Sequence, residues 1–178
     1  MERVLKVGFA DAGQVAELAD LAATTFPLAC PPSVGPDDVA AFIAENLSTA
    51  RFDAYLADPD RTVLTAEDDG RLVGYAMLIR GLPDDPDVRG AVTTAPTIEI
   101  SKMYVLPGSH GGGVSAALMS AALHHASTLN MASVWLGVNQ RNERAQRFYR
   151  KHGFEVAGTK TFRLGEHLEQ DYVMVRPV

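Results

Sequence analysis

The sequence predicts a mixed α/β domain, and three observations support this prediction. Helical patterns come first, between Asp11 and Leu56. An antiparallel hairpin signal follows, where Asp69-Gly70 separates two apolar runs. The remaining chain then gives strand, helix, strand, helix and closing strands, an order typical of layered α/β domains. A chain of 178 residues is long enough for one sizeable core, so we expect a single domain over residues 1–178.

The first half of the chain is expected to begin with a strand and continue into helices. Asp11 can cap the helix that follows the strand, and Phe26-Pro27 is expected to end that helix. Pro36 fits the first turn of a second helix, because that position needs no amide hydrogen. The segment 81–96 holds the acidic turn PDDPD and is expected to be a loop. The expected elements here are strand 4–9, helices starting near 12, 36 and 52, and strands 62–66 and 72–79.

The second half is centred on the stretch from Thr97 to Asn130, which predicts a buried strand, a glycine-rich turn and a helix of small and apolar residues. The turn carries His110-Gly111-Gly112-Gly113-Val114-Ser115. Three consecutive glycines leave backbone N–H groups uncovered where a helix begins, and those donors suit a phosphate. Glycines before a helix also serve plain turns, so this loop alone leaves both interpretations open. The expected elements after it are strand 134–138, helix 142–152, and strands 154–157 and 172–175 around a turn at Gly165.

A second pattern lies in the segment VNQRNERAQRFYRKHGF. Asn142, Ala145 and Tyr149 fall on one helix face, with Phe148 expected to turn toward the core. Gly153 then ends the helix, as glycine at a helix C-terminus does. The alternative is an amphipathic helix whose tyrosine is simply a half-buried ring.

Together, these two patterns closely resemble the GNAT superfamily of acyl-CoA-dependent N-acetyltransferases. His110 stands where that family has Gln or Arg, and Ser115 where it has Gly or Ala. A closer resemblance is to the bacterial Pai-type spermidine/spermine N-acetyltransferases, in EISKMYVLP, VWLGVNQRNERAQRFYRKHGF and FRLGEHLEQDYVM. The resemblance implies a central mixed sheet of about six to seven strands, flanked by helices and splayed between the fourth and fifth strands.

The resemblance also implies a binding site for acetyl-CoA as cosubstrate. A histidine at position 110 gives the pyrophosphate less charge than arginine when neutral, so cofactor binding is expected to be weaker or pH-sensitive. Ser115 is small enough for close approach and can cap the helix. The residues implied to contact the cofactor are Met103, Tyr104, Val105, His110, Gly111, Gly112, Gly113, Val114, Ser115, Asn142, Ala145, Phe148 and Tyr149.

Acetyl transfer to an amine needs a base for the ammonium proton and a donor for the departing thiolate. Glu99 is the only acidic residue of the central strand and is the candidate base, although pairing with Lys102 or an arginine explains it equally well. Tyr149 matches the family's general acid. The candidate acceptor-binding residues are Phe26, Tyr55, Glu99 and Asp171.

Composition excludes several classes of function. A net charge of −6 and a pI near 5.3 argue against nucleic acid as a partner. Cys30 is the only cysteine and no metal-ligand cluster stands out, so we expect no metal. No signal peptide or membrane span is expected, which favours a cytoplasmic protein.

The predicted partners are acetyl-CoA and a small amine, with a homodimer possible. The leading prediction is acetylation of a polyamine. The alternatives are an amino acid, peptide or protein N-terminal amine as acceptor, or a non-catalytic acyl-CoA-binding module. A nucleotide-binding Rossmann domain is disfavoured, because the loop lacks the G-x-G-x-x-G pattern.

Overall fold

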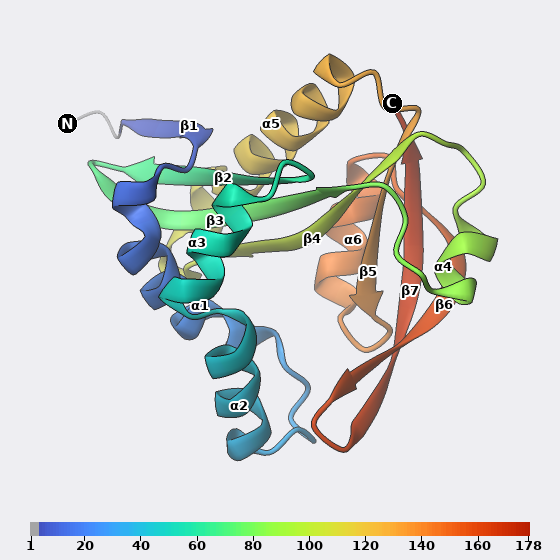
Figure 1. The fold of residues 1–178 in the computed structure, drawn as a ribbon, viewed down its shortest axis with the longest axis horizontal. Helices are drawn as coiled ribbons and strands as arrows, with labels where there is room; N and C mark the ends of the chain where they lie inside the picture. Colours follow the sequence, from blue (N-terminus) through green and yellow to red (C-terminus); the bar gives the residue numbers. More distant parts are fainter. Residues whose placement is uncertain (1–3) are drawn as a thin grey trace. The chain divides into compact units, whose positions relative to one another are not determined.

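A computed structural model describes residues 4–178 of the protein, and for residues 110–112 it describes the backbone alone. The helices and strands are labelled in Figure 1. The contacts within the chain divide it into two compact units. The first unit takes in the chain up to Leu78 together with Lys102–Ala122, and the second holds Ile79–Ser101 and Leu123–Val178. Each unit is described in its own right below.

In the part of the chain that the structure describes, seven strands form a mixed sheet in the order β1-β2-β3-β4-β5-β7-β6. Strands β4 and β5 are parallel, whereas β1 with β2, β5 with β7, and β6 with β7 are antiparallel. This arrangement confirms the predicted mixed α/β fold. The strands are β1 (Leu5–Phe9), β2 (Arg61–Asp68), β3 (Arg71–Arg80), β4 (Thr97–Val105), β5 (Ser133–Asn139), β6 (Glu155–Leu164) and β7 (His167–Pro177).

The first unit begins with β1, a single 3₁₀ turn and three helices. Asp11 caps the turn as predicted, since its carboxylate accepts a hydrogen bond from the Gly13 amide at 2.8 Å. Helix α1 packs against α2 and α3, and α3 packs against β2. The helices are α1 (Val15–Ala29), α2 (Pro36–Asn46) and α3 (Thr49–Ala57).

Helix α1 corrects one prediction, because it continues through Pro27 to Ala29 instead of ending near Phe26-Pro27. Proline removes one hydrogen bond within a helix but does not prevent the next residues from keeping helical dihedrals. The turn before Pro27 is anchored by Phe26, which is buried and stacks on Phe42 of α2 with ring centroids 4.5 Å apart. Packing between helices therefore outweighs the local signal.

The hairpin between β2 and β3 turns where the sequence predicts it. Asp69 and Gly70 have φ values of 52° and 82°, both in the left-handed region. Two positive φ values are the mark of the type I′ turn, whose twist matches that of the flanking strands.

The second unit contains a short helix, α4 (Pro86–Ala91), inside the segment expected to be a loop. The Asp85 carboxylate caps it by accepting a hydrogen bond from the Asp87 amide at 2.9 Å, and Pro86 occupies the first turn. Val88 belongs to a buried cluster with Trp135 of β5 and Val173 of β7. The prediction was wrong because this apolar contact lies far away in the sequence and gives no local periodicity.

Strands β6 and β7 are longer than predicted and form an extended hairpin around Gly165, which has a φ of 62°. Strand β7 lies between β6 and β5 and pairs with β5 along all seven residues of that strand. The register of β4 with β5 is much shorter, covering Thr97–Glu99 and Ser133–Trp135. The short register agrees with the expected splay between these two strands.

The remaining helices each follow one of the parallel strands. Strand β4 leads through a 3₁₀ helix, η2 (Pro107–Gly112), into α5 (Val114–Thr128), and β5 leads into α6 (Glu143–Lys151). Within residues 4–178, no helix is both long enough and apolar enough to cross a membrane.

Candidate active site

The segment between β4 and α5 is a 3₁₀ helix followed by one left-handed residue, Gly113, with a φ of 78°. This differs from the open glycine turn predicted, because 3₁₀ bonding engages backbone groups within the loop. The amides of Val114, Ser115 and Ala116 still lie in the first turn of α5, where no intrahelical acceptor exists. Ser115 is therefore inside the helix and does not precede it as a cap.

The start of α5 is suited to an anion for reasons of both shape and charge. Gly113 has no side chain with which to cap the helix, and its positive φ favours glycine. The first turn of α5 carries no acidic residue. The side chain of His110 and the surroundings of Gly111 and Gly112 lie outside the described residues, so their predicted contacts with the cofactor stay predictions.

The C-terminal part of β4 is fixed along the edge that faces β3. The Leu106 amide donates to the Val73 carbonyl at 2.8 Å. A Cβ on Gly74 would come within 3.1 Å of the Tyr104 carbonyl and of Val105, so glycine permits the close approach of the two strands. Val105 is buried, whereas Met103 and Tyr104 are partly exposed.

Tyr104 joins a cluster of aromatic rings within the first unit. Its ring lies 5.9 Å from that of Tyr75 and 6.5 Å from that of Phe26, measured between centroids. Burial, with Tyr104 and Tyr55 nearby, raises the pKa of the Tyr75 phenol well above its usual value. Phe26, a predicted acceptor-binding residue, is thus a core residue of this cluster.

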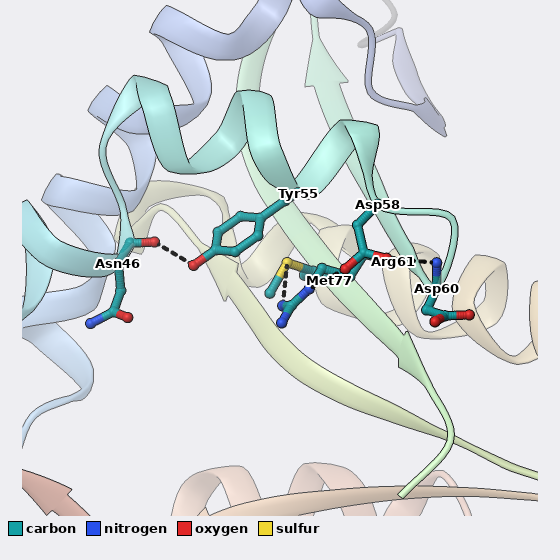
Figure 2. Close-up of polar contacts among 6 residues, drawn as sticks. All are labelled: Asn46, Tyr55, Asp58, Asp60, Arg61 and Met77. Atoms are coloured by element: carbon teal, nitrogen blue, oxygen red, sulfur yellow. Dashed lines mark hydrogen bonds and ion pairs between the residues drawn. The ribbon is translucent and has the colours of Figure 1, made fainter. Parts of the chain in front are cut away.

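Tyr55, also predicted to bind the acceptor, holds neighbouring elements together (Figure 2). Its hydroxyl donates to the Asn46 carbonyl at 2.7 Å, and the Arg61 guanidinium lies 4.8 Å from the centre of its ring. Arg61 also pairs with Asp58 at 3.2 Å and contacts the sulfur of Met77 at 3.8 Å. These contacts link α2, α3, β2 and β3, and a role for Tyr55 in acceptor binding stays a prediction.

Glu99 of β4 lies in the second unit, between the buried residues Ile98 and Ile100. It is in register with Trp135 of the parallel strand β5, so the two side chains point to the same face of the sheet. Glu99 is only partly buried. A partly buried carboxylate on a strand is chemically suited to accept a proton.

Helix α6 carries the predicted general acid, Tyr149. The Asn142 side chain caps the helix by accepting a hydrogen bond from the Ala145 amide at 3.1 Å, which confirms the predicted cap. The Tyr149 ring lies 5.6 Å from Phe148 and 6.0 Å from Phe154. Burial raises the pKa of Tyr149 to about 12, so the phenol is a proton donor at neutral pH. Phe148, predicted to face the core, is only partly buried.

Gln146 is a residue that the sequence analysis missed. It is buried, and its amide nitrogen donates to the carbonyls of Asn139 and Gln140 at 3.1 and 3.0 Å. These bonds hold the turn from β5 into α6 and so fix the direction of the helix. The sequence feature that could have indicated this role is its spacing. Gln146 lies four residues after the cap Asn142, and this spacing places its side-chain amide near the turn from β5 into α6.

Asp171, a predicted acceptor-binding residue, is buried on β7 next to groups that the sequence analysis did not single out. The Lys160 ammonium of β6 lies 3.5 Å from its carboxylate. Glu169 is also buried, and it accepts a hydrogen bond from the Asn139 amide at 3.2 Å. Burial raises the pKa of Asp171, Glu169 adds to the rise, and Lys160 only partly offsets it. The two-residue spacing of Glu169 and Asp171 was the available signal, because alternate strand residues share a face.

Comparison with solved structures defines the class of fold. A PaiA N-acetyltransferase from Thermoplasma acidophilum, solved in complex with coenzyme A, superimposes with a TM-score of 0.77, covering 98% of this chain and 99% of that one at 17% sequence identity. A ribosomal-protein-alanine N-acetyltransferase from Brucella melitensis gives a TM-score of 0.71, covering 97% and 99% at 19% identity. At such identities the likeness shows the fold alone, which is that of the acetyltransferases.

Sequence comparison gives the family. The model of the acetyltransferase (GNAT) family matches residues 16–154. An uncharacterized N-acetyltransferase of Mycobacterium tuberculosis is 59% identical over 160 residues, which cover 90% of this chain and 95% of that protein. A mycothiol acetyltransferase of Frankia alni is 36% identical over 99 residues, or 56% of this chain and 29% of that protein. The chain belongs to the GNAT family, and it is an acyl-CoA-dependent N-acetyltransferase that uses acetyl-CoA as its cosubstrate.

Proposed function

We propose that the protein acetylates a primary amine of a small cationic acceptor, with a polyamine such as spermidine or spermine as the leading candidate. The observation that supports a cationic acceptor is the acidic face of the second unit. Glu169 and Asp171 are buried there, Glu99 shares the face, and Lys160 pairs with Asp171. The net charge of −6 also favours the approach of cations.

The cofactor is proposed to bind through the backbone of the first unit. The first-turn amides of α5, from Val114 to Ala116, suit its pyrophosphate, because the positive end of the helix dipole lies there. The partly exposed residues Met103 and Tyr104 belong to the strand whose backbone is proposed to pair with the amide-bearing arm. His110, Asn142, Ala145 and Phe148 are proposed contacts from the resemblance.

Two side chains are proposed to move the protons of the reaction. Bound acetyl-CoA supplies the acetyl group as a thioester. Glu99 takes one proton from the acceptor ammonium, and the freed nitrogen forms the new bond to the acetyl carbon as the carbon–sulfur bond breaks. Tyr149 then donates its phenol proton to the departing sulfur. The acylated nitrogen loses its second proton to solvent, and solvent returns a proton to the Tyr149 phenolate. Because a thiol has a pKa of only about 8.5, this donation contributes less than it would for a poorer leaving group.

A second class of acceptor is favoured by one of the relatives. The Frankia alni relative is named for mycothiol, so a mycothiol-type amine is an alternative acceptor. An amino acid, peptide or protein N-terminal amine is the other alternative. The cytoplasm as the site of action, a single domain and a homodimeric assembly stay predictions from the sequence.

The test is release of coenzyme A thiol from acetyl-CoA in the presence of a panel of amines. The panel contains spermidine, spermine, a mycothiol precursor amine, free amino acids and short peptides. We expect the highest kcat/KM for a polyamine. Preference for a peptide or for the mycothiol precursor would replace the polyamine proposal, and binding of acetyl-CoA without turnover of any amine would contradict the proposed activity.

A further inference from the structure

The C-terminal end of α6 is closed by a Schellman motif, and Tyr149 is the first residue of that motif. The Phe154 amide donates to the Tyr149 carbonyl at 3.1 Å. The Gly153 amide donates to the Arg150 carbonyl at 3.0 Å. These are the six-to-one and five-to-two hydrogen bonds that define the motif. Gly153 is the left-handed residue that the motif requires, with a φ of 91°.

The motif holds Tyr149 through both its backbone and its ring. The Tyr149 carbonyl also accepts a hydrogen bond from the His152 amide at 3.0 Å, so two amides bind this carbonyl. The Tyr149 and Phe154 rings pack with their centroids 6.0 Å apart, which is the apolar contact that often accompanies a Schellman motif. The position of the phenol therefore depends on how the chain leaves the helix.

Arg176 of β7 binds the same end of the helix from a neighbouring element. Its Nε–H donates to the carbonyl of His152, the C-cap residue, at 2.8 Å, and one of its terminal nitrogens donates to the Pro177 carbonyl at 3.1 Å. Both partners are backbone carbonyls, so the guanidinium acts on the course of the chain. Its positive charge is also favourable here, because the negative end of the helix dipole lies at the last carbonyls.

Gly153 permits this close approach of Arg176. A Cβ at position 153 would lie 3.0 Å from the Arg176 Nε, 3.5 Å from its Cδ and 3.6 Å from its Cγ. The arginine stem therefore lies directly over the glycine, and a side chain at position 153 would leave too little room for the Nε at the His152 carbonyl. Both properties of glycine are used here, its freedom at positive φ and its lack of a side chain.

We propose that Arg176 is a positioning residue for Tyr149: its Nε–H fixes the C-terminal end of α6 and thereby the place of the phenol. This inference rests on the proposed role of Tyr149 as the general acid. Misplacing a reacting group by about 1 Å can cost about 100-fold in rate. Because Arg176 acts through Tyr149, its loss lowers kcat and leaves the KM values for acetyl-CoA and the amine unchanged.

Three variants separate the hydrogen bond of Arg176 from its charge. In Arg176→Gln the amide nitrogen is attached to Cδ, as the arginine Nε is, so the donor is kept and the charge is lost. Arg176→Lys keeps the charge but has no donor at this position, and Arg176→Met has neither. Thiol release is measured with the amine of the panel above that gives the highest kcat/KM. We expect kcat to fall about tenfold in Arg176→Met and Arg176→Lys, and to stay within about twofold of the wild type in Arg176→Gln.

A double-mutant cycle tests whether Arg176 acts through Tyr149. In the Tyr149→Phe background no phenol remains to be positioned, so Arg176→Met is expected to cause no further loss of kcat. A general loss of structure would lower kcat by the same factor in both backgrounds. Arg89→Met is the matched control, because the Arg89 Nε–H also donates to a backbone carbonyl, that of Pro83 at 2.9 Å. This control is expected to leave kcat unchanged.

The position of the Tyr149 ring can also be followed without turnover. Labelling the ring carbon Cζ of tyrosine with carbon-13 gives one NMR signal for each of the five tyrosines, and Tyr149→Phe identifies the signal of Tyr149. In Arg176→Met this signal is expected to shift, whereas the signals of Tyr55, Tyr75 and Tyr104 are expected to stay in place. Melting temperatures show which variants fold, and Arg176→Lys replaces Arg176→Met if the latter does not.

Three results would overturn the inference. The first is a wild-type kcat in Arg176→Met. The second is an equal loss of kcat with and without the Tyr149 hydroxyl, which would make Arg176 a purely structural residue. The third is an unchanged Tyr149 signal in Arg176→Met. Failure of the wild type to acetylate any amine would contradict the proposed function, whereas the NMR comparison would still decide whether Arg176 positions the ring.

Discussion

Helices α5 and α6 each follow one of the two parallel strands, yet they begin in opposite ways. Helix α6 satisfies its N-terminus with its own side chains. Asn142 accepts a hydrogen bond from the Ala145 amide, and Glu143 adds a negative charge in the first turn. Helix α5 follows Gly113, which has no side chain, and carries no acid in its first turn. A helix start that is not satisfied internally is available to an external anion. The comparison shows that the start of α6 is stabilised by its own side chains, whereas the start of α5 leaves its first-turn amides to the proposed pyrophosphate.

The proposed general acid, Tyr149, lies on α6, the helix whose N-terminus is capped by Asn142. We expect Tyr149→Phe to lower kcat about 100-fold, at the low end for a general acid, since a thiolate is a good leaving group. The KM for acetyl-CoA is expected to change little. Steady-state kinetics of thiol release measure both values.

The pH dependence of the wild type sharpens this prediction. Because burial raises the pKa of Tyr149 to about 12, the phenol stays protonated throughout the assay range. The kcat of the wild type should therefore show no loss from this group up to pH 10. A variant with wild-type kcat would remove Tyr149 from the mechanism.

Anion binding at the N-terminus of α5 is tested by adding a carboxylate to its first turn, as Glu143 does in α6. Ser115→Glu places a carboxylate in the first turn, where it repels a bound pyrophosphate. The KM for acetyl-CoA is expected to rise about 30-fold, which corresponds to about 2 kcal/mol of lost electrostatic attraction.

Ser127→Glu is the matched control, because Ser127 is exposed near the other end of the same helix. This change adds the same charge far from the first turn and is expected to leave the KM for acetyl-CoA unchanged. Equal KM values for the two variants would argue against a pyrophosphate at the start of α5.

The contribution of the α6 cap to stability is tested by removing the Asn142 side chain. Asn142→Ala leaves the Ala145 amide without its side-chain partner and is expected to cost about 1 kcal/mol of stability. For a chain of this size the melting temperature should fall by about 2–4 °C. Thermal unfolding followed by circular dichroism measures the shift, and an unchanged melting temperature would show that the cap contributes nothing to stability.

The sequence by itself determined the features whose partners are close along the chain. The Asp11 cap, the Asp69-Gly70 turn and the Asn142 cap each depend on contacts within about three residues. Such contacts leave a local signature, because the same few residues supply both groups. For that reason the order of most strands and helices was predictable, together with the tyrosine helix, whereas α4 and the 3₁₀ helix η2 were not.

Only the tertiary structure decided where distant residues meet. Helix α1 passes through Pro27 because Phe26 stacks on α2, and α4 forms because Val88 packs beside Trp135. Lys160 of β6 meets Asp171 of β7 because β7 pairs with β6 in the sheet, an order of strands that no local pattern encodes. Burial and charge pairing depend on neighbours in space. For this reason the sequence alone does not show that Glu99, Asp171 and Lys160 lie on one face of the sheet.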